Sequence, residues 1–206
     1  MAHKKLVIVG AGGHGKVVAD IADKMNIYDE IYYLDDCLIG KEIGGKMVIS
    51  GVEYAIEHKD DVDAFIAIGN ASIRQNIFNR YRGVGVTIPT LIHPNAVIAS
   101  DVKIGTGTVV MAGTVINSGT EIGQGVIINT CASVDHDNVI GDFVHISVGA
   151  HLAGNVSVDH STWIGIGAVV SNNISIIGNV VIGAGATVVN DIEEEGTYVG
   201  VPARRL

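Results

Sequence analysis

Aliphatic residues recur at every sixth position through the second half of the chain. The series begins at Ile92 and ends at Val188, and each of its positions is occupied by Ile, Val or Leu. The fourth residue after such a position is usually small or β-branched, as at Ala96, Thr108, Thr114, Val126, Ala132, Ala150, Ala168 and Ala186. Glycine often follows the aliphatic residue directly, as at Gly105, Gly123, Gly141, Gly165 and Gly183. A period of six matches neither an amphipathic helix nor a simple strand alternation.

This period predicts a parallel β-helix in which each hexad forms one short face and three faces form one coil. Each aliphatic side chain then points inward and stacks on its equivalent eighteen residues away. We expect the glycines after the aliphatic positions to serve the corners, where φ is positive or space is short. At the usual strand spacing of about 4.8 Å, five to six coils make a column roughly 25 Å tall. No helix is compatible with this register.

The first ninety residues follow a different pattern, in which short apolar runs alternate with helical ones. Strands are predicted at residues 6–9, 31–34 and 64–68, and helices from residue 16 onward, at 52–58 and at 72–81. Alternation of this kind is typical of a small parallel α/β sheet. The sequence therefore predicts a Rossmann-like domain at residues 1–90 and a β-helix with a C-terminal tail at residues 91–206.

Composition narrows the classes of partner. The formal net charge is −9, and residues 91–206 alone carry 10 acidic and 3 basic side chains, which argues against nucleic acid and anionic membranes. No apolar run is long enough to span a bilayer, and the start, including His3, carries no signal-peptide cleavage site. The two cysteines, Cys37 and Cys131, are expected to be free thiols, with Cys131 in packing. These features favour a cytoplasmic protein.

A glycine-rich loop follows the first predicted strand. Residues 10–15 read Gly-Ala-Gly-Gly-His-Gly, the spacing G-x-G-x-x-G, and the acidic pair Asp35-Asp36 ends the next strand. Such a loop lets the backbone approach a diphosphate at a helix N-terminus, while the acidic pair suits hydrogen bonds to ribose or base. Because the domain holds only about half of a dinucleotide fold, a nucleotide-sugar or mononucleotide fits better than NAD. A tight turn without a ligand is the alternative.

Together the two halves resemble the bacterial sugar acyltransferases of the sialic acid O-acetyltransferase type, and among them the UDP-4-amino-sugar N-acetyltransferases of glycan biosynthesis. The resemblance rests on residues 10–15, 34–36 and 65–70, on the hexads carrying Asn129-Thr130, His136-Asp137 and residues 145–150, and on the closing residues 200–205. It implies a left-handed β-helix, a homotrimer with active sites between subunits, and acetyl-CoA as the donor. The left hand comes from the resemblance alone, since strand crossovers are normally right-handed.

Attack on a thioester needs a base that takes a proton from the nucleophile and a donor for the oxyanion. His136, flanked by Asp135 and Asp137, is the predicted general base; in the family an acidic residue follows the histidine and orients its ring. That residue is usually glutamate, so the shorter Asp137 predicts a longer or water-bridged contact. Adding eighteen to 136 gives Gly154, whose N–H we expect beside His136, and the resemblance assigns it to the acetyl carbonyl. His93 and His160 are expected to be exposed.

The remaining site residues are assigned with the resemblance in view. His145 lies on another face from His136, so we expect the two to meet across a trimer interface, with His145 against acetyl-CoA and Asn129 near the reacting atoms. Ile166 and Ala184, one coil apart, line the groove for the rest of acetyl-CoA. In the front domain, the nucleotide of a UDP-sugar or related amino-sugar is assigned to Gly12, Gly13, His14, Asp35, Asp36, Gly69 and Asn70.

Other functions stay open from the sequence. The acceptor could be a hydroxyl of sialic acid or of a polysaccharide sugar. Trimeric β-helices of the γ-carbonic anhydrase type bind zinc between subunits, and His136, His145 and His151 raise that possibility, although no metal is expected here. Cys131 as an acyl-carrying nucleophile lacks a histidine partner in its own hexad. A nucleotide-sensing trimeric scaffold without catalysis would need only the aliphatic ladder.

Overall fold

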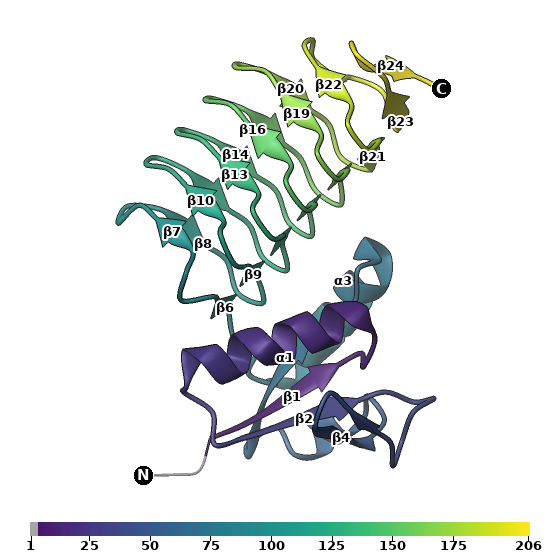
Figure 1. Cartoon of the computed structure of the whole chain (residues 1–206). Helices are drawn as coiled ribbons and strands as arrows, with labels where there is room; N and C mark the ends of the chain where they lie inside the picture. The colour runs from purple at the N-terminus through teal and green to yellow at the C-terminus, as the bar shows by residue number, and fades with distance from the viewer. Residues whose placement is uncertain (1–3) are drawn as a thin grey trace. The chain divides into compact units, whose positions relative to one another are not determined.

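The structure is a computed structural model that describes residues 4–206, so His3 lies outside the described residues. The chain divides into two compact units, one ending at Pro94 and one running from Asn95 to Leu206. Figure 1 shows an α/β unit with helices against a sheet and a second unit made of stacked coils. Among residues 4–206, no helix combines the length and the apolar character needed to cross a membrane.

The first unit is a five-stranded sheet of order β3-β4-β2-β1-β5. Its pairings are parallel except for β3, which is antiparallel to β4. The elements are β1 (Lys5–Val9), α1 (Gly13–Met25), β2 (Glu30–Leu34), β3 (Glu42–Ile43), β4 (Lys46–Ser50), α2 (Tyr54–Glu57), β5 (Val62–Ile66), α3 (Ala71–Val84) and β6 (Leu91–Ile92). The predicted alternation of strands and helices is therefore confirmed, although β5 begins and ends two residues earlier than expected.

Two features of this unit differ from the prediction. The sequence pattern missed the β3–β4 hairpin, whose signal is Gly44-Gly45: both glycines have positive φ, 57° and 79°, as a two-residue hairpin turn requires. Helix α1 begins at Gly13, three residues before the predicted start. The second half of the glycine loop is thus the first turn of the helix.

The second unit is the expected left-handed parallel β-helix. Its three faces are called first, second and third in the order in which β7, β8 and β9 begin them. The first face has order β22-β19-β16-β13-β10-β7, the second β20-β17-β14-β11-β8, and the third contains β24-β23-β21-β18-β15-β12-β9. The first-face strands are β7 (Val97–Ile98), β10 (Val115–Ile116), β13 (Ser133–Val134), β16 (His151–Leu152), β19 (Val169–Val170) and β22 (Thr187–Val188). The second-face strands are β8 (Lys103–Ile104), β11 (Glu121–Ile122), β14 (Val139–Ile140), β17 (Ser157–Val158) and β20 (Ser175–Ile176). The third-face strands are β9 (Val109–Val110), β12 (Ile127–Ile128), β15 (His145–Ile146), β18 (Trp163–Ile164), β21 (Val180–Ile182), β23 (Gly196–Val199) and β24 (Arg204–Arg205).

The eighteen-residue step predicted from the hexads is the register of the stacked pairs from β7 to β22, as in Ile116 with Val134 and Val134 with Leu152, whereas β23 pairs with β21 at a step of sixteen residues. The aliphatic residues from Val110 to Val188 are buried, while Ile92, Ile98 and Ile104 are half-buried. Each full burial of such a side chain stabilises the fold by roughly 1.5–3 kcal/mol. The core of this unit is therefore the predicted apolar ladder.

The corners need positive φ two residues later than expected. From Ile104 to Ile182, the third residue after each aliphatic position has φ between 56° and 74°, whether it is glycine, as at Gly149, or not, as at Asp137. Among the described residues, positive φ does not occur at the glycines that directly follow an aliphatic position, namely Gly105, Gly123, Gly141, Gly165 and Gly183. They are needed for space: a Cβ on Gly105 would lie 2.5 Å from the backbone of Gly123 in the next coil.

Candidate active site

His136 lies at the corner between the first and second faces of the β-helix, two residues after β13. Its Nδ1 is 2.8 Å from a carboxylate oxygen of Asp137, so the contact is direct and the expected longer or bridged one was wrong. Asp137 occupies the left-handed corner position, with φ of 57°, and this turns its short side chain back toward the preceding ring. Because a carboxylate only accepts, Nδ1 carries the proton and leaves Nε2 available as the basic nitrogen.

The carboxylates around His136 also set its protonation. The hydrogen bond that His136 donates to Asp137 raises the pKa of His136 above its ordinary value of 6.5, and the charges of Asp135 and Asp137 act in the same direction. Partial desolvation opposes them. Asp135 is itself engaged, because its carboxylate accepts from the backbone N–H of His136 at 2.9 Å and from the Asn117 amide at 2.7 Å. The imidazole is thus oriented and made more basic at the same corner.

Gly154 lies one coil beyond His136, against the free edge of the imidazole. A Cβ at this position would lie 2.4 Å from His136 Nε2 and 2.5 Å from Cε1, so only glycine leaves the ring in place. Among residues 4–206, no hydrogen bond uses the Gly154 N–H. A backbone donor and a basic nitrogen therefore stand side by side, which is the arrangement that acyl transfer requires.

Asn138, which the sequence reasoning missed, supports this corner from inside the coil. Its side chain is fully buried and donates to the carbonyls of Asp135 at 2.7 Å and Ala153 at 3.0 Å. Its Oδ1 accepts from the Val156 N–H at 2.9 Å. The signal was its place in the hexad: it is an amide at the inward position that otherwise holds small or β-branched residues. Asn138 ties together the coil that carries His136 and the coil that carries Gly154.

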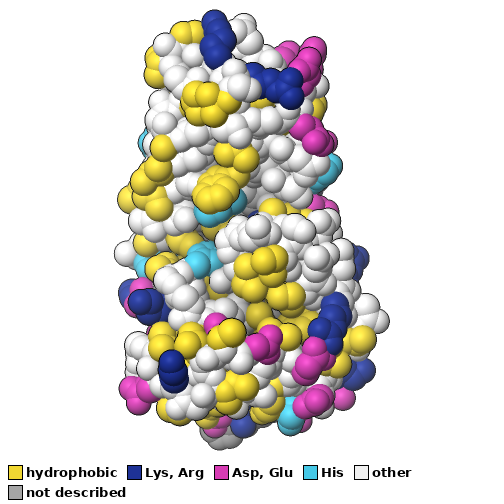
Figure 2. All heavy atoms as spheres, turned by 90° about the vertical axis from the view of Figure 1, so that its right-hand side faces the viewer, with side chains coloured by type: hydrophobic (Ala, Val, Ile, Leu, Met, Phe, Trp, Pro, Cys, Tyr) yellow, Lys and Arg dark blue, Asp and Glu magenta, His cyan; other side chains and the backbone are white. Residues whose placement is uncertain are grey.

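The third face carries a second group of polar side chains, His145 and Asn129 among them. The Asn129 Oδ1 accepts from the Thr130 N–H at 2.8 Å, which turns its Nδ2 toward His145 Nε2, 3.2 Å away. The structure brings Asn129 and His145 together but places His145 on β15, on a different face from the His136 corner. Figure 2 shows histidine among apolar side chains on the side of the β-helix turned to the viewer.

An apolar hollow of about 240 Å³ lies farther along the third face. It brings Ile166 and Ala184 together, as their spacing of one coil predicts, and Ile166 is 56% exposed. The other lining residues are Ser147, Trp163, Gly165, Val181, Ile182 and Gly183. A shallow apolar groove of this size suits the alkyl part of an extended ligand.

In the first unit, the glycines of the loop fall into two kinds. Gly10 has φ of 98°, and a Cβ on Gly15 would lie 2.0 Å from the Gly10 carbonyl, so the fold itself requires these two. A Cβ on Gly12 or Gly13 would meet nothing within 4 Å. The latter pair, at the N-terminus of α1, is free of internal constraint and leaves the backbone open to a ligand.

His14 lies in the first turn of α1 and is largely buried. Burial lowers its pKa to about 4, and the positive charge of Arg74 adds to the effect. Its Nε2 is enclosed and meets no hydrogen-bond partner among the described residues 4–206. The ring is therefore neutral at neutral pH.

The two carboxylates after β2 have different tasks. Asp35 braces the glycine loop, because its side chain accepts from the Ala11 N–H at 3.2 Å and from the Cys37 N–H at 3.0 Å. Asp36 accepts from the Val52 N–H at 3.1 Å through Oδ1, and its other oxygen has no hydrogen bond within residues 4–206. Both line a hollow of about 280 Å³ whose other walls are Val9, Gly10, Leu34, Cys37, Val52, Ile68, Ile73 and Ile77. The hollow lies at the carboxyl ends of β1 and β2, where ligands of parallel α/β sheets bind.

Gly69 and Asn70 follow β5 but do not line this hollow. Asn70 caps α3, since its Oδ1 accepts from the Ile73 N–H at 3.0 Å. The buried Arg74 donates to the carbonyls of Ile68 at 2.8 Å and Gly69 at 2.9 Å. The structure therefore gives both residues a part in shaping the segment beside the hollow.

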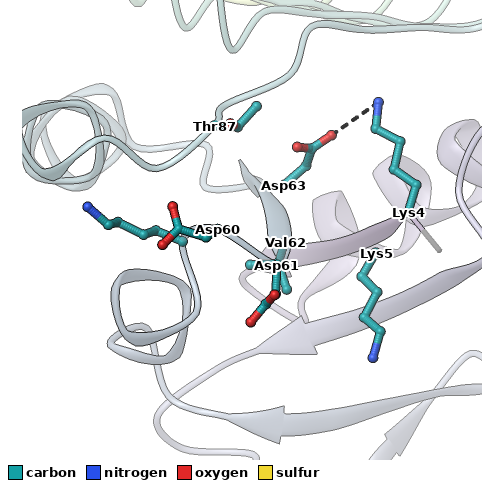
Figure 3. A pocket seen from close by; sticks show the side chains of 8 residues that line it. Lys4, Lys5, Asp60, Asp61, Val62, Asp63 and Thr87 are labelled. Atoms are coloured by element: carbon teal, nitrogen blue, oxygen red, sulfur yellow. Dashed lines mark ion pairs between the residues drawn. The ribbon is translucent and has the colours of Figure 1, made fainter. Parts of the chain in front are cut away.

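A third hollow, of about 180 Å³, lies at the opposite edge of the sheet, where β1 and β5 begin (Figure 3). It is lined by Lys4, Lys5, Lys59, Asp60, Asp61, Val62, Asp63 and Thr87, and Lys4 pairs with Asp63 at 3.3 Å. Charges of both signs compensate one another there, and the edge is the one that ligands of parallel sheets avoid.

Two expectations about single residues were wrong. His93 is buried, with 6% exposure, rather than exposed. Cys131 is exposed at a left-handed corner rather than packed, because the corner position directs its side chain out of the coil. Among residues 4–206, no three His, Cys, Asp or Glu side chains gather closely enough to hold a metal ion.

Comparison with known proteins finds a matching domain family for the first unit and relatives for the chain. The model of the PglD N-terminal domain matches residues 5–81. A curated relative, the UDP-N-acetylbacillosamine N-acetyltransferase of Bacillus subtilis (strain 168), is 40% identical over 114 residues. That match covers 53% of this chain and 52% of the relative, so the chain aligns with about half the length of that protein.

Several solved structures match nearly the whole chain, among them two with bound ligands. The acetyltransferase domain of PglB from Neisseria gonorrhoeae FA1090, in complex with acetyl coenzyme A, is 41% identical with a TM-score of 0.96 and covers 99% of this chain and 100% of its own. PerB from Caulobacter crescentus, in complex with CoA and GDP-perosamine, is 33% identical with a TM-score of 0.91, covering 98% and 97%.

Proposed function

The chain belongs to the family of acetyltransferases that join a PglD-type N-terminal domain to a β-helix, and we propose that it transfers acetyl from acetyl-CoA to the amino group of a nucleotide-linked 4-amino sugar in glycan biosynthesis. UDP is the favoured nucleotide, because the Bacillus relative named for a UDP-linked sugar is 40% identical over the matched region. The observation that carries the proposal is the His136 ring, held by Asp137 at 2.8 Å and facing Gly154.

In the reaction, the neutral amine of the sugar attacks the thioester carbon. The N–C bond forms and the C–S bond breaks, and His136 Nε2 takes the proton that the nitrogen loses. The same proton then passes to the departing thiolate, which leaves as free CoA. Asp137 stabilises the imidazolium that exists between the two proton transfers, so the raised pKa of His136 serves the step directly.

The developing oxyanion needs a donor that is already in place. The Gly154 N–H supports this role, because it has no acceptor among residues 4–206 and lies beside the ring that holds the proton. A preorganised backbone donor of this kind typically contributes about 10²- to 10³-fold in kcat.

The nucleotide part of the acceptor is assigned to the first unit. The open backbone at Gly12 and Gly13 suits the diphosphate at the start of α1. The free oxygen of Asp36 suits a hydroxyl or base N–H, while neutral His14, Gly69 and Asn70 complete the set. Asp35 acts mainly through the loop that it braces.

The acyl donor is assigned to the third face, with His145 and Asn129 near the thioester end and Ile166 and Ala184 along the groove. Since His136 and His145 occupy different faces of one β-helix, we propose a homotrimer in which neighbouring subunits complete each active site. A cytoplasmic location, where acetyl-CoA and nucleotide sugars are available, belongs to the same proposal.

The test is thiol release from acetyl-CoA with a panel of UDP-4-amino sugars and their hydroxyl counterparts. We expect turnover of an amino sugar, and His136→Ala should reduce it by about 10²-fold or more with the fold intact. His160→Ala is the matched control, because His160 also lies under a glycine one coil on, Gly178, at a corner without an acidic residue after it. Turnover restricted to hydroxyl sugars would refute N-acetylation, and equal turnover in His136→Ala would refute the base.

A further inference from the structure

Trp163 is the only tryptophan of the chain, and it stands on the surface beside the groove of the third face. It begins β18 and points outward, and 49% of it is exposed. The equivalent positions on this face hold the buried Val109 and Ile127 and then His145 in earlier coils, and the partly exposed Val181 in the next coil. The exposed indole and the apolar groove beside it form one contiguous apolar patch, and such a patch points to binding.

The indole is fixed rather than mobile. Its Nε1–H donates to the Ser147 hydroxyl at 2.6 Å, and Ser147 is buried with 6% exposure. Both residues line the same hollow as Ile166 and Ala184. One edge of the indole is therefore anchored in the coil below, and the plane of the ring is set.

That plane in turn sets the His145 ring. The two rings stack with centroids 5.4 Å apart and an interplanar angle of 9°. On its edge, His145 Nε2 accepts from the Asn129 amide at 3.2 Å. His145 is thus held on one face by Trp163 and on one edge by Asn129, so its orientation precedes ligand binding.

We infer that Trp163 is a positioning residue of the acyl-donor site. It fixes the orientation of the His145 imidazole, and it forms an apolar wall of the adjacent groove against which the alkyl part of acetyl-CoA lies. The inference rests on the proposed function, which assigns His145, Ile166 and Ala184 to the donor but gives Trp163 no part. Trp163 links His145 to the groove of Ile166 and Ala184, because the same side chain contacts His145 and lines the groove.

The experiment uses the full-length protein and two readouts. First, free CoA is titrated while the emission of the single tryptophan is recorded, and calorimetry gives the dissociation constant independently. Second, the kinetics of Trp163→Ala, Trp163→Phe and Ser147→Ala are measured. Val97→Ala is the control, since Val97 holds the equivalent hexad position on the first face, outside the site, and is 64% exposed.

We expect the emission to change with CoA and to saturate at the calorimetric constant. Trp163→Ala should raise the KM for acetyl-CoA roughly 5- to 10-fold, the effect of losing one aromatic contact, with the KM for the amino sugar and the unfolding midpoint unchanged. Trp163→Phe keeps the stack and should lose about 2- to 3-fold. In the double variant, Ser147→Ala should cause no further loss beyond that of Trp163→Phe, because Trp163→Phe already removes the N–H that donates to Ser147.

Two results would overturn the inference while the proposed function stands: a wild-type KM for acetyl-CoA in an active Trp163→Ala enzyme, or constant emission while calorimetry shows CoA binding. Failure of the wild-type protein both to bind CoA and to release thiol with any amino sugar would instead overturn the proposed function, and this inference with it.

Discussion

A methyl group added at Gly154 would enter the space of the His136 imidazole. The Cβ of Gly154→Ala would lie 2.4 Å from Nε2 and 2.5 Å from Cε1, whereas ordinary contacts begin near 3.4 Å. The ring must therefore move by about 1 Å, and a displacement of that size typically costs about 10²-fold in rate. Since the His136 side chain is 56% exposed, it can swing outward, so the fold itself should be retained.

Thiol release measures the effect, and the single tryptophan reports donor binding separately. We expect kcat for Gly154→Ala to fall about 10²-fold with CoA binding and the unfolding midpoint unchanged. Gly178→Ala is the matched control, because its Cβ would press on the His160 ring at 2.8 Å in the same stacking geometry. It should keep wild-type kcat. A wild-type kcat in Gly154→Ala, or an equal loss in Gly178→Ala, would refute the role given to this stack.

Three further predictions concern His136, His145 and Asn138. The neutral form of His136 is the base and its pKa lies above 6.5, so the acid limb of the pH profile of kcat/KM should lie above pH 6.5. Asp137→Asn removes the carboxylate that is the largest cause of the raised pKa, so this limb should move to lower pH. A limb that stays in place would contradict the role given to Asp137. Mixing inactive His136→Ala and His145→Ala subunits should restore about one quarter of wild-type activity if neighbouring subunits complete each site, and none if each site lies within one chain. Asn138→Val removes four side-chain hydrogen bonds and should cost about 2–4 kcal/mol in the free energy of unfolding, measured in urea. Asn138→Thr should cost only about 1 kcal/mol, because threonines at equivalent positions make the two inter-coil bonds; equal losses in both variants would contradict this account.

The sequence alone specified the β-helix, because its core is periodic. An aliphatic residue at every sixth position has only one arrangement that buries all of them, and the eighteen-residue register follows from three hexads per coil. The same arithmetic located Gly154 over His136 without coordinates. The alternation in the first ninety residues was equally readable, since helices and strands impose different periods on apolar residues.

What the sequence could not give depends on contacts between residues far apart in the chain. Whether Asp137 reaches His136 was decided by a left-handed corner, and a short side chain made the bond that length alone argued against. The division of labour between Asp35 and Asp36, and the support from Asn138, required knowing which backbone groups lie within hydrogen-bond reach.

The clearest case is Trp163. In the sequence it is an aromatic residue at a hexad position that tolerates any side chain, because outward positions are not constrained by the core. Only the stacking of coils brings it against His145 and Ser147, residues eighteen and sixteen positions earlier. Periodic burial fixes the backbone from local pattern, whereas the chemistry of the surface depends on which side chains neighbouring coils place together, and that is decided in three dimensions.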